Sequence, residues 1–176
     1  MNAAIDNFQR LTINSCMRFF FLALLCLLSA ACNTTNESAK PALKIVAVTP
    51  RYMETKQFKR ISEYMTGKEN PGKRVIMRTN PRLRNGYYFV LTLDRNVRKL
   101  PPDAYIQGEF YTSKSLDLQT HRFEFPSIVP NTREIFVGLT GDAWPKKDAI
   151  PAAWRFTIKN SRGEILAQEQ SYLWSL

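Results

Sequence analysis

The sequence has few of the side chains that most often build metal or nucleophilic sites. Its 176 residues include one histidine, His121, and three cysteines, Cys16, Cys26 and Cys32. Downstream of Cys32 there is no further cysteine or second histidine, which excludes a zinc site made from these residue types. No Gly-x-Ser-x-Gly elbow and no glycine-rich phosphate loop is present. His121 shares a predicted strand face with two phenylalanines, so we interpret it as a packed side chain and expect no metal, cofactor or catalytic residue.

Long apolar runs are also missing. The longest, residues 19–28, has ten residues and follows Arg18. A membrane-spanning helix needs about 20 apolar residues, whereas this length is typical of the apolar region of an export signal. The small residues at positions 29–31 are of the kind that a signal peptidase needs beside the bond it cleaves, and Cys32 follows them directly.

Residues 17–33 resemble the type II signal of bacterial lipoproteins, in which small residues precede a lipidated cysteine. Ala30, Ala31 and Cys32 fit this pattern, and Ser29 departs from it. The resemblance implies a diacylglyceryl thioether and an acylated amino group on Cys32, which would anchor the protein firmly in a membrane. Asn33 stands where an aspartate tends to retain the family in the inner membrane. The resemblance thus favours the periplasmic face of the outer membrane, with the inner membrane as the alternative.

The domain organisation predicted from these features is simple. Residues 1–31 form the signal peptide, with 1–16 interpreted as an over-extended start before Met17. Residues 32–42 comprise the lipidated cysteine and a polar, flexible tether. Residues 43–176 are long enough for one domain with a proper core.

Short apolar-polar alternations separated by turn residues run through this domain and predict antiparallel strands with one buried face. The spacing favours an all-β, immunoglobulin-like β-sandwich of about seven or eight strands, with a partly open barrel as the alternative. The nearly all-apolar run 43–48 predicts a central strand, and 164–174 predicts the last one. Residues 58–67 have helical apolar spacing and end at Gly67, so they are either a short helix across one end of the sandwich or a distorted edge strand. The other predicted strands are 73–79, 87–94, 104–112, 121–125, 134–140 and 154–159.

Acidic residues are scarce in one half of the domain. Residues 51–99 contain 13 basic and 4 acidic side chains, whereas residues 100–176 contain 8 and 9. A concentrated positive field attracts anions, although it can also be a solvated surface without a single partner. We expect an anionic envelope component or a protein partner, no nucleic acid, and a monomer. The candidate contacts are Arg78, Arg82, Arg84, Arg95, Arg98 and Lys99.

One aromatic residue in a loop suggests an alternative function. Trp144 lies between Asp142 and Asp148, and a tryptophan beside acids can stack on a sugar ring. The same loop can equally be a turn whose tryptophan covers one end of the sandwich. The sequence therefore predicts a membrane-anchored, non-enzymatic binding or structural module of the envelope, with an accessory carbohydrate-binding lipoprotein as the alternative.

Overall fold

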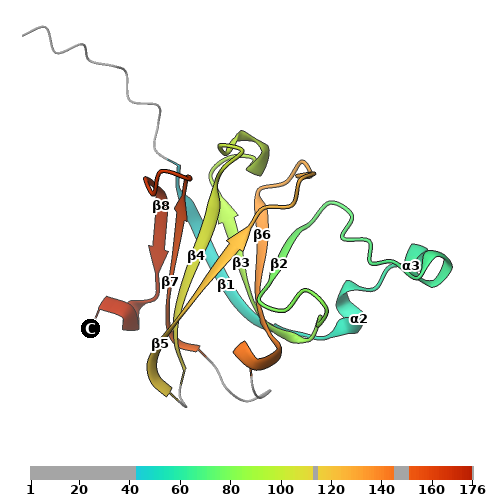
Figure 1. Ribbon diagram of the computed structural model, residues 1–176, viewed down its shortest axis with the longest axis horizontal. Coiled ribbons are helices and arrows are strands. Elements are labelled where there is room, and N and C mark those ends of the chain that lie inside the picture. Colours follow the sequence, from blue (N-terminus) through green and yellow to red (C-terminus); the bar gives the residue numbers. More distant parts are fainter. Residues whose placement is uncertain (1–42, 113–114, 145–150, 176) are drawn as a thin grey trace, which may run out of the picture. The chain divides into compact units, whose positions relative to one another are not determined.

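Two four-stranded sheets make up the domain in the computed structural model, which describes residues 43–112, 115–144 and 151–175 (Figure 1). The signal, Cys32, the tether and Asp148 lie outside these residues. The first sheet has the order β1 (Ile45–Met53), β3 (Gly86–Leu93), β6 (Glu134–Thr140) and β2 (Val75–Arg78). The second has the order β5 (Ser115–Glu124), β4 (Tyr105–Thr112), β7 (Pro151–Lys159) and β8 (Ile165–Gln170). The predicted all-β class is confirmed.

The core lies between the two sheets, and the predicted alternation supplies it. Phe89 on β3, Phe110 on β4 and Phe156 on β7 are fully buried, with ring centroids between 5.0 and 5.4 Å apart. These edge and tilted ring contacts are the arrangement that aromatic quadrupoles prefer. Because the three rings come from both sheets, this cluster joins the sheets at their centre.

Two expectations about the strands are wrong. The run 43–48 was expected to be central, but β1 is an edge strand that pairs only with β3, and most of its side chains are exposed. The predicted antiparallel arrangement fails at β2, which pairs with β6 in parallel. The reason lies in residues 54–74, because a parallel return needs a crossover connection of about a dozen or more residues. This segment carries the chain from β1 across to the far edge of the sheet; it is called the insert below.

The insert contains two short helices, α2 (Thr55–Phe58) and α3 (Ile61–Thr66). The prediction that Gly67 ends a helix is confirmed: its φ of 65° is left-handed, as is common after a last helical turn. Instead of crossing an end of the sandwich, the insert packs on the outer face of the first sheet, where Phe58 contacts Tyr88 with ring centroids 4.9 Å apart. No helix among the described residues is both long and apolar enough to cross a membrane.

Two loops at one end of the sandwich position the site discussed below. One follows β3 and contains the short 3-10 helix η1 (Val97–Lys99), which the Asn96 side chain caps by accepting a hydrogen bond from the Arg98 N–H. The other connects β5 to β6. The Val97 N–H donates to the Thr132 carbonyl at 2.8 Å, which ties the two loops together. At the C-terminus the last strand is shorter than predicted, since β8 ends at Gln170 and the 3-10 helix η3 (Tyr172–Ser175) follows.

The insert offers a matched pair of substitutions. Phe58→Ala should lower the free energy of unfolding by about 3 kcal/mol, because it removes a buried aromatic side chain from the outer face of the sheet. Ile61→Ala, three residues away on an exposed position, should change it by less than about 0.5 kcal/mol. Denaturant unfolding measures both values. Equal effects would show that the insert does not pack on the sheet.

Candidate functional site

The six predicted basic contacts do not lie together. Arg84 precedes β3 and Arg95 follows it, so the eight residues of the strand separate them by about 25 Å at 3.3 Å per residue. Arg78 and Arg82 lie at the Arg84 end, and Arg98 and Lys99 at the Arg95 end. The structure therefore divides the six residues between the two ends of one strand.

Arg78 is held inside the molecule by a network of partners. Its Nη1 and Nη2 donate to the two Glu69 carboxylate oxygens at 3.0 and 2.7 Å, and its Nε donates to the Tyr88 hydroxyl at 2.7 Å. Its Cζ lies 4.9 Å from the centre of the Phe58 ring. Only 7% of the Arg78 side chain is exposed. A guanidinium engaged in this way attaches the insert to the sheet and cannot receive an outside anion.

Arg84 extends this network. Its Nη1 donates to the Glu63 carboxylate at 2.6 Å, its Nε lies 3.3 Å from Glu69, and its carbonyl accepts from the Tyr88 hydroxyl. The hydrogen bond from Arg84 lowers the pKa of Glu63, and the Glu63 side chain is 8% exposed. Residues 63, 69, 78, 84 and 88 are called the insert network below. They neutralise two of the predicted basic contacts within the protein.

The remaining predicted cations differ in their surroundings. Arg95 forms an ion pair with Asp94 at 2.7 Å, and this contact lowers the pKa of Asp94 to about 2. Arg82 and Lys99 are exposed, and no ion pair within the described chain involves them. Arg98 is also exposed and borders a hollow in the surface. Arg78 lines a different hollow, but its guanidinium is already engaged by Glu69 and Tyr88.

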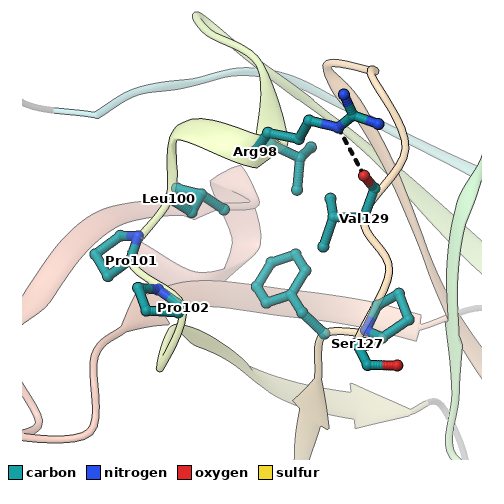
Figure 2. A pocket seen from close by; sticks show the side chains of 9 residues that line it. Arg98, Leu100, Pro101, Pro102, Ser127 and Val129 are labelled. Carbon is teal, nitrogen blue, oxygen red and sulfur yellow. Dashed lines mark hydrogen bonds between the residues drawn. The ribbon is translucent and has the colours of Figure 1, made fainter.

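The hollow beside Arg98 has a volume of about 440 Å³ and lies between the two end loops (Figure 2). Leu100 and Val129 point into it, and the Arg98 guanidinium stands at its rim. A second hollow of about 380 Å³ shares Arg98 and Pro126 with the first, and a third of about 290 Å³ shares Pro126. The first two hollows are called the Arg98 groove below.

The walls of the Arg98 groove are apolar and stiff. Five prolines line it, and each has a fixed φ and no N–H to donate. Aliphatic and aromatic side chains supply most of the remaining surface. The apolar and proline lining residues are Pro71, Ile76, Val97, Leu100, Pro101, Pro102, Phe125, Pro126, Ile128, Val129 and Pro130.

Two guanidinium groups give the groove its charge. The Nε of Arg98 donates to the Val129 carbonyl at 2.8 Å, which orients the guanidinium, and within the described chain no hydrogen bond engages its two terminal nitrogens. Arg74 lines the second hollow, with its Cζ 5.4 Å from the centre of the Phe136 ring. The described residues lining these two hollows include no aspartate or glutamate. The groove is thus a positive, largely apolar site, and an arginine fork of this kind matches a carboxylate or a phosphate.

Trp144 lies elsewhere and is buried. It is 7% exposed and stacks on Tyr87 with ring centroids 4.9 Å apart at 30°. It therefore covers the core next to η2 (Gly141–Ala143), and neither ring face is free to hold a sugar in this structure. Among the described residues, no three His, Cys, Asp or Glu side chains are placed to hold a metal ion. Burial lowers the pKa of His121, which packs between Phe110 and Phe123.

Sequence reasoning found Arg98 but missed the groove. Prolines 101, 102, 126 and 130 cannot continue a strand ladder, and that property alone does not indicate a groove. Their clustering in two separate loops was the available signal, because loops that connect strands often meet at one end of a sandwich. Arg74 was not among the candidates, since its position in the hollow depends on where the insert returns to β2.

Removing one partner of the insert network should lower the free energy of unfolding, because it leaves a buried charge unpaired. Glu69→Ala leaves the Arg78 guanidinium without its carboxylate, and we expect the free energy of unfolding to fall by about 2–3 kcal/mol. Glu124→Ala is the control, because its ion pair with Arg122 is exposed and should contribute less than about 0.5 kcal/mol. Thermal or urea unfolding distinguishes the two. Similar losses in both variants would contradict the assigned burial.

Known proteins give no further guide to this site. No protein-family model matches the chain, and no curated protein or solved structure matches it. The interpretation of the Arg98 groove therefore rests on the geometry and charge of its own residues.

Proposed function

We propose that this chain is an envelope lipoprotein whose β domain is a non-enzymatic binding module for an anionic segment of a protein partner. The Arg98 groove is the observation that carries the proposal. It combines two guanidinium groups with apolar walls and has no acidic residue among its described lining. A volume of about 440 Å³ falls in the range of about 300–1,000 Å³ that is usual for ligand pockets.

The bound segment would place a carboxylate against Arg98 and an apolar side chain between Leu100 and Val129. The Nε bond to Val129 holds the guanidinium before binding, so less rotamer freedom is lost on association. The proline-rich walls are also rigid before binding, so they lose little conformational freedom on association. A free anion without an apolar part would use only the charge of the site, which favours a peptide segment over an inorganic ion.

For the location we propose the periplasmic face of the outer membrane, with acyl chains on Cys32. The support is the sequence pattern of residues 17–33 described above. Residues 32–42 would then act as the tether that lets the domain reach its partner. The inner membrane remains the alternative location.

For the fold we propose an immunoglobulin-like arrangement. The order β1-β3-β6 matches strands A-B-E of that fold, and β5-β4-β7-β8 matches C′-C-F-G. Strand β2 occupies the position of strand D, but it precedes β3 in the chain and runs parallel to β6. The insert between β1 and β2 is the departure from the common pattern, and it contributes Arg74 to the groove.

Arg98→Ala should weaken binding of a fluorescent glutamate-rich peptide about tenfold or more, because the carboxylate loses a charge-assisted contact. Arg98→Lys should bind with intermediate affinity, since an ammonium cannot form the two parallel hydrogen bonds. Fluorescence anisotropy at two salt concentrations measures both effects. Arg82→Ala is the matched control, an exposed arginine outside the groove, and it should bind like the original protein. Equal losses of affinity in the Arg82 and Arg98 variants would show that the peptide binds through the overall positive charge of the domain and not through the groove.

Cys32→Ser should release the protein from membranes, because the acyl chains would have no sulfur to join. Fractionation of cells expressing each form measures the distribution, and Cys26→Ser is the control because that residue lies in the predicted signal. A Cys32→Ser protein that stays with the membrane fraction would contradict the acyl anchor.

A further inference from the structure

Helix α3 presents its apolar side to solvent. Ile61, Tyr64 and Met65 are 86%, 76% and 86% exposed. Their spacing of i, i+3 and i+4 places them on one face of the helix. In an ordinary surface helix such a face packs on the core and the polar face meets water. The arrangement here is reversed, and Figure 1 shows α3 beyond α2, away from the two sheets.

The polar side of α3 is the side that is attached. Glu63 pairs with Arg84 at 2.6 Å and accepts a hydrogen bond from the Asn70 N–H, and the Asn70 amide donates to the Ser62 hydroxyl at 3.0 Å. These contacts hold the helix by its charged face. The outward apolar face is therefore a consequence of specific contacts, and a hydrophobic patch of this kind often marks an interaction site.

The same contacts place two acidic side chains of the insert on the side that faces the sheet. Glu63 and Glu69 turn toward the sheet and pair with arginines of the insert network. One cation lies directly beside the apolar patch, since the Lys59 ammonium is 5.8 Å from the centre of the Tyr64 ring. Lys59, Arg60 and Lys68 flank α3 in the chain and are exposed, whereas Lys56 on α2 pairs with Glu54 at 3.0 Å.

We propose that Ile61, Tyr64 and Met65 insert into the headgroup region of an anionic membrane. Lys59 and Lys68 would then contact the lipid phosphates. Apolar side chains beside cations are the pattern of interfacial helices, and tyrosine suits a boundary that is apolar on one side and wet on the other. Lysine is depleted in protein-protein interfaces but is attracted to anionic lipid surfaces. The charge and composition of the patch thus favour a lipid surface over a protein.

This inference rests on the proposed envelope location, and it adds a second membrane contact besides the acyl chains. Contact through α3 would orient the domain, since the ion pair of Glu63 with Arg84 ties α3 to the start of β3. The Arg98 groove lies near the start of β2, to which the insert leads, and its access would then depend on that orientation.

The test uses the full chain with all three cysteines replaced by serine, so that no acyl chain forms and a single new cysteine can be labelled. An environment-sensitive dye is attached at Met65→Cys or, as the control, at Ile165→Cys, an exposed apolar position on β8. The probes are vesicles containing phosphatidylglycerol and vesicles of phosphatidylcholine alone. We expect a blue shift and protection from aqueous iodide for the dye at 65 on the anionic vesicles only, and no change at 165.

Two variants sharpen the result. Ile61→Ser with Tyr64→Ser should weaken partitioning to anionic vesicles about tenfold or more, because two exposed apolar side chains no longer contact the lipid. Lys59→Glu with Lys68→Glu should abolish the difference between the two lipids. Unchanged unfolding midpoints would show that the variants are folded.

Other outcomes overturn the proposal. A dye at 65 that stays in water on both vesicles, or that shifts equally on both, excludes a specific anionic lipid contact. A shift at 65 that requires added envelope protein would assign the patch to a protein interface. The leader is the same in both labelled forms, so its insertion cannot produce a difference between them. Peptide binding by the Arg98 groove and fractionation of Cys32→Ser are separate measurements, so failure here is distinguishable from failure of the proposed function.

Discussion

The burial of the Arg78 guanidinium is the constraint on which the arrangement of the surface depends. A charge with 7% of its side chain exposed must be matched by opposite charge and by hydrogen-bond acceptors. Glu69 and Tyr88 meet this need from two different elements, one in the insert and one on β3. Matching the charge therefore attaches the insert to the sheet, and it also turns the acidic side of α3 inward and leaves its apolar side in solvent.

Internal ion pairs also reduce the number of free cations in the basic half of the domain. A high count of arginine suggests a broad cationic face, but Arg78, Arg84 and Arg95 are paired with carboxylates inside the molecule. Two of the remaining cations have distinctive surroundings: the Arg98 guanidinium stands at the rim of a proline-lined hollow, and the Lys59 ammonium lies beside the apolar patch on α3. The two surfaces suit different partners, since the first is concave and rigid and the second is a small convex projection.

Several elements were predictable because they depend on neighbours in the chain. Alternation predicts one buried face for the strands at 73–79 and 104–112, and Val75, Met77, Ile106 and Phe110 at alternating positions of β2 and β4 are buried. The edge position of β1 was not predictable, because an apolar run is equally compatible with a central strand and with an edge strand. The direction of β2 was missed for a related reason: it depends on the path of the insert, which is held by pairs such as Arg78 with Glu69 and Arg84 with Glu63.

The sequence by itself determined the all-β class, the buried faces of strands such as β2 and β4, and the end of α3 at Gly67, since each depends on local periodicity or on a few adjacent residues. The export signal stays a prediction from the sequence. Only the tertiary structure decided which arginine is available, where the prolines of two distant loops meet, and which side of α3 faces water. The physical reason is that a charge or a ring is free or engaged according to partners that folding brings from other elements. The Arg98 side chain illustrates this: within the described chain it donates one hydrogen bond, to the carbonyl of Val129, in a loop that strands β4 and β5 separate from it along the chain.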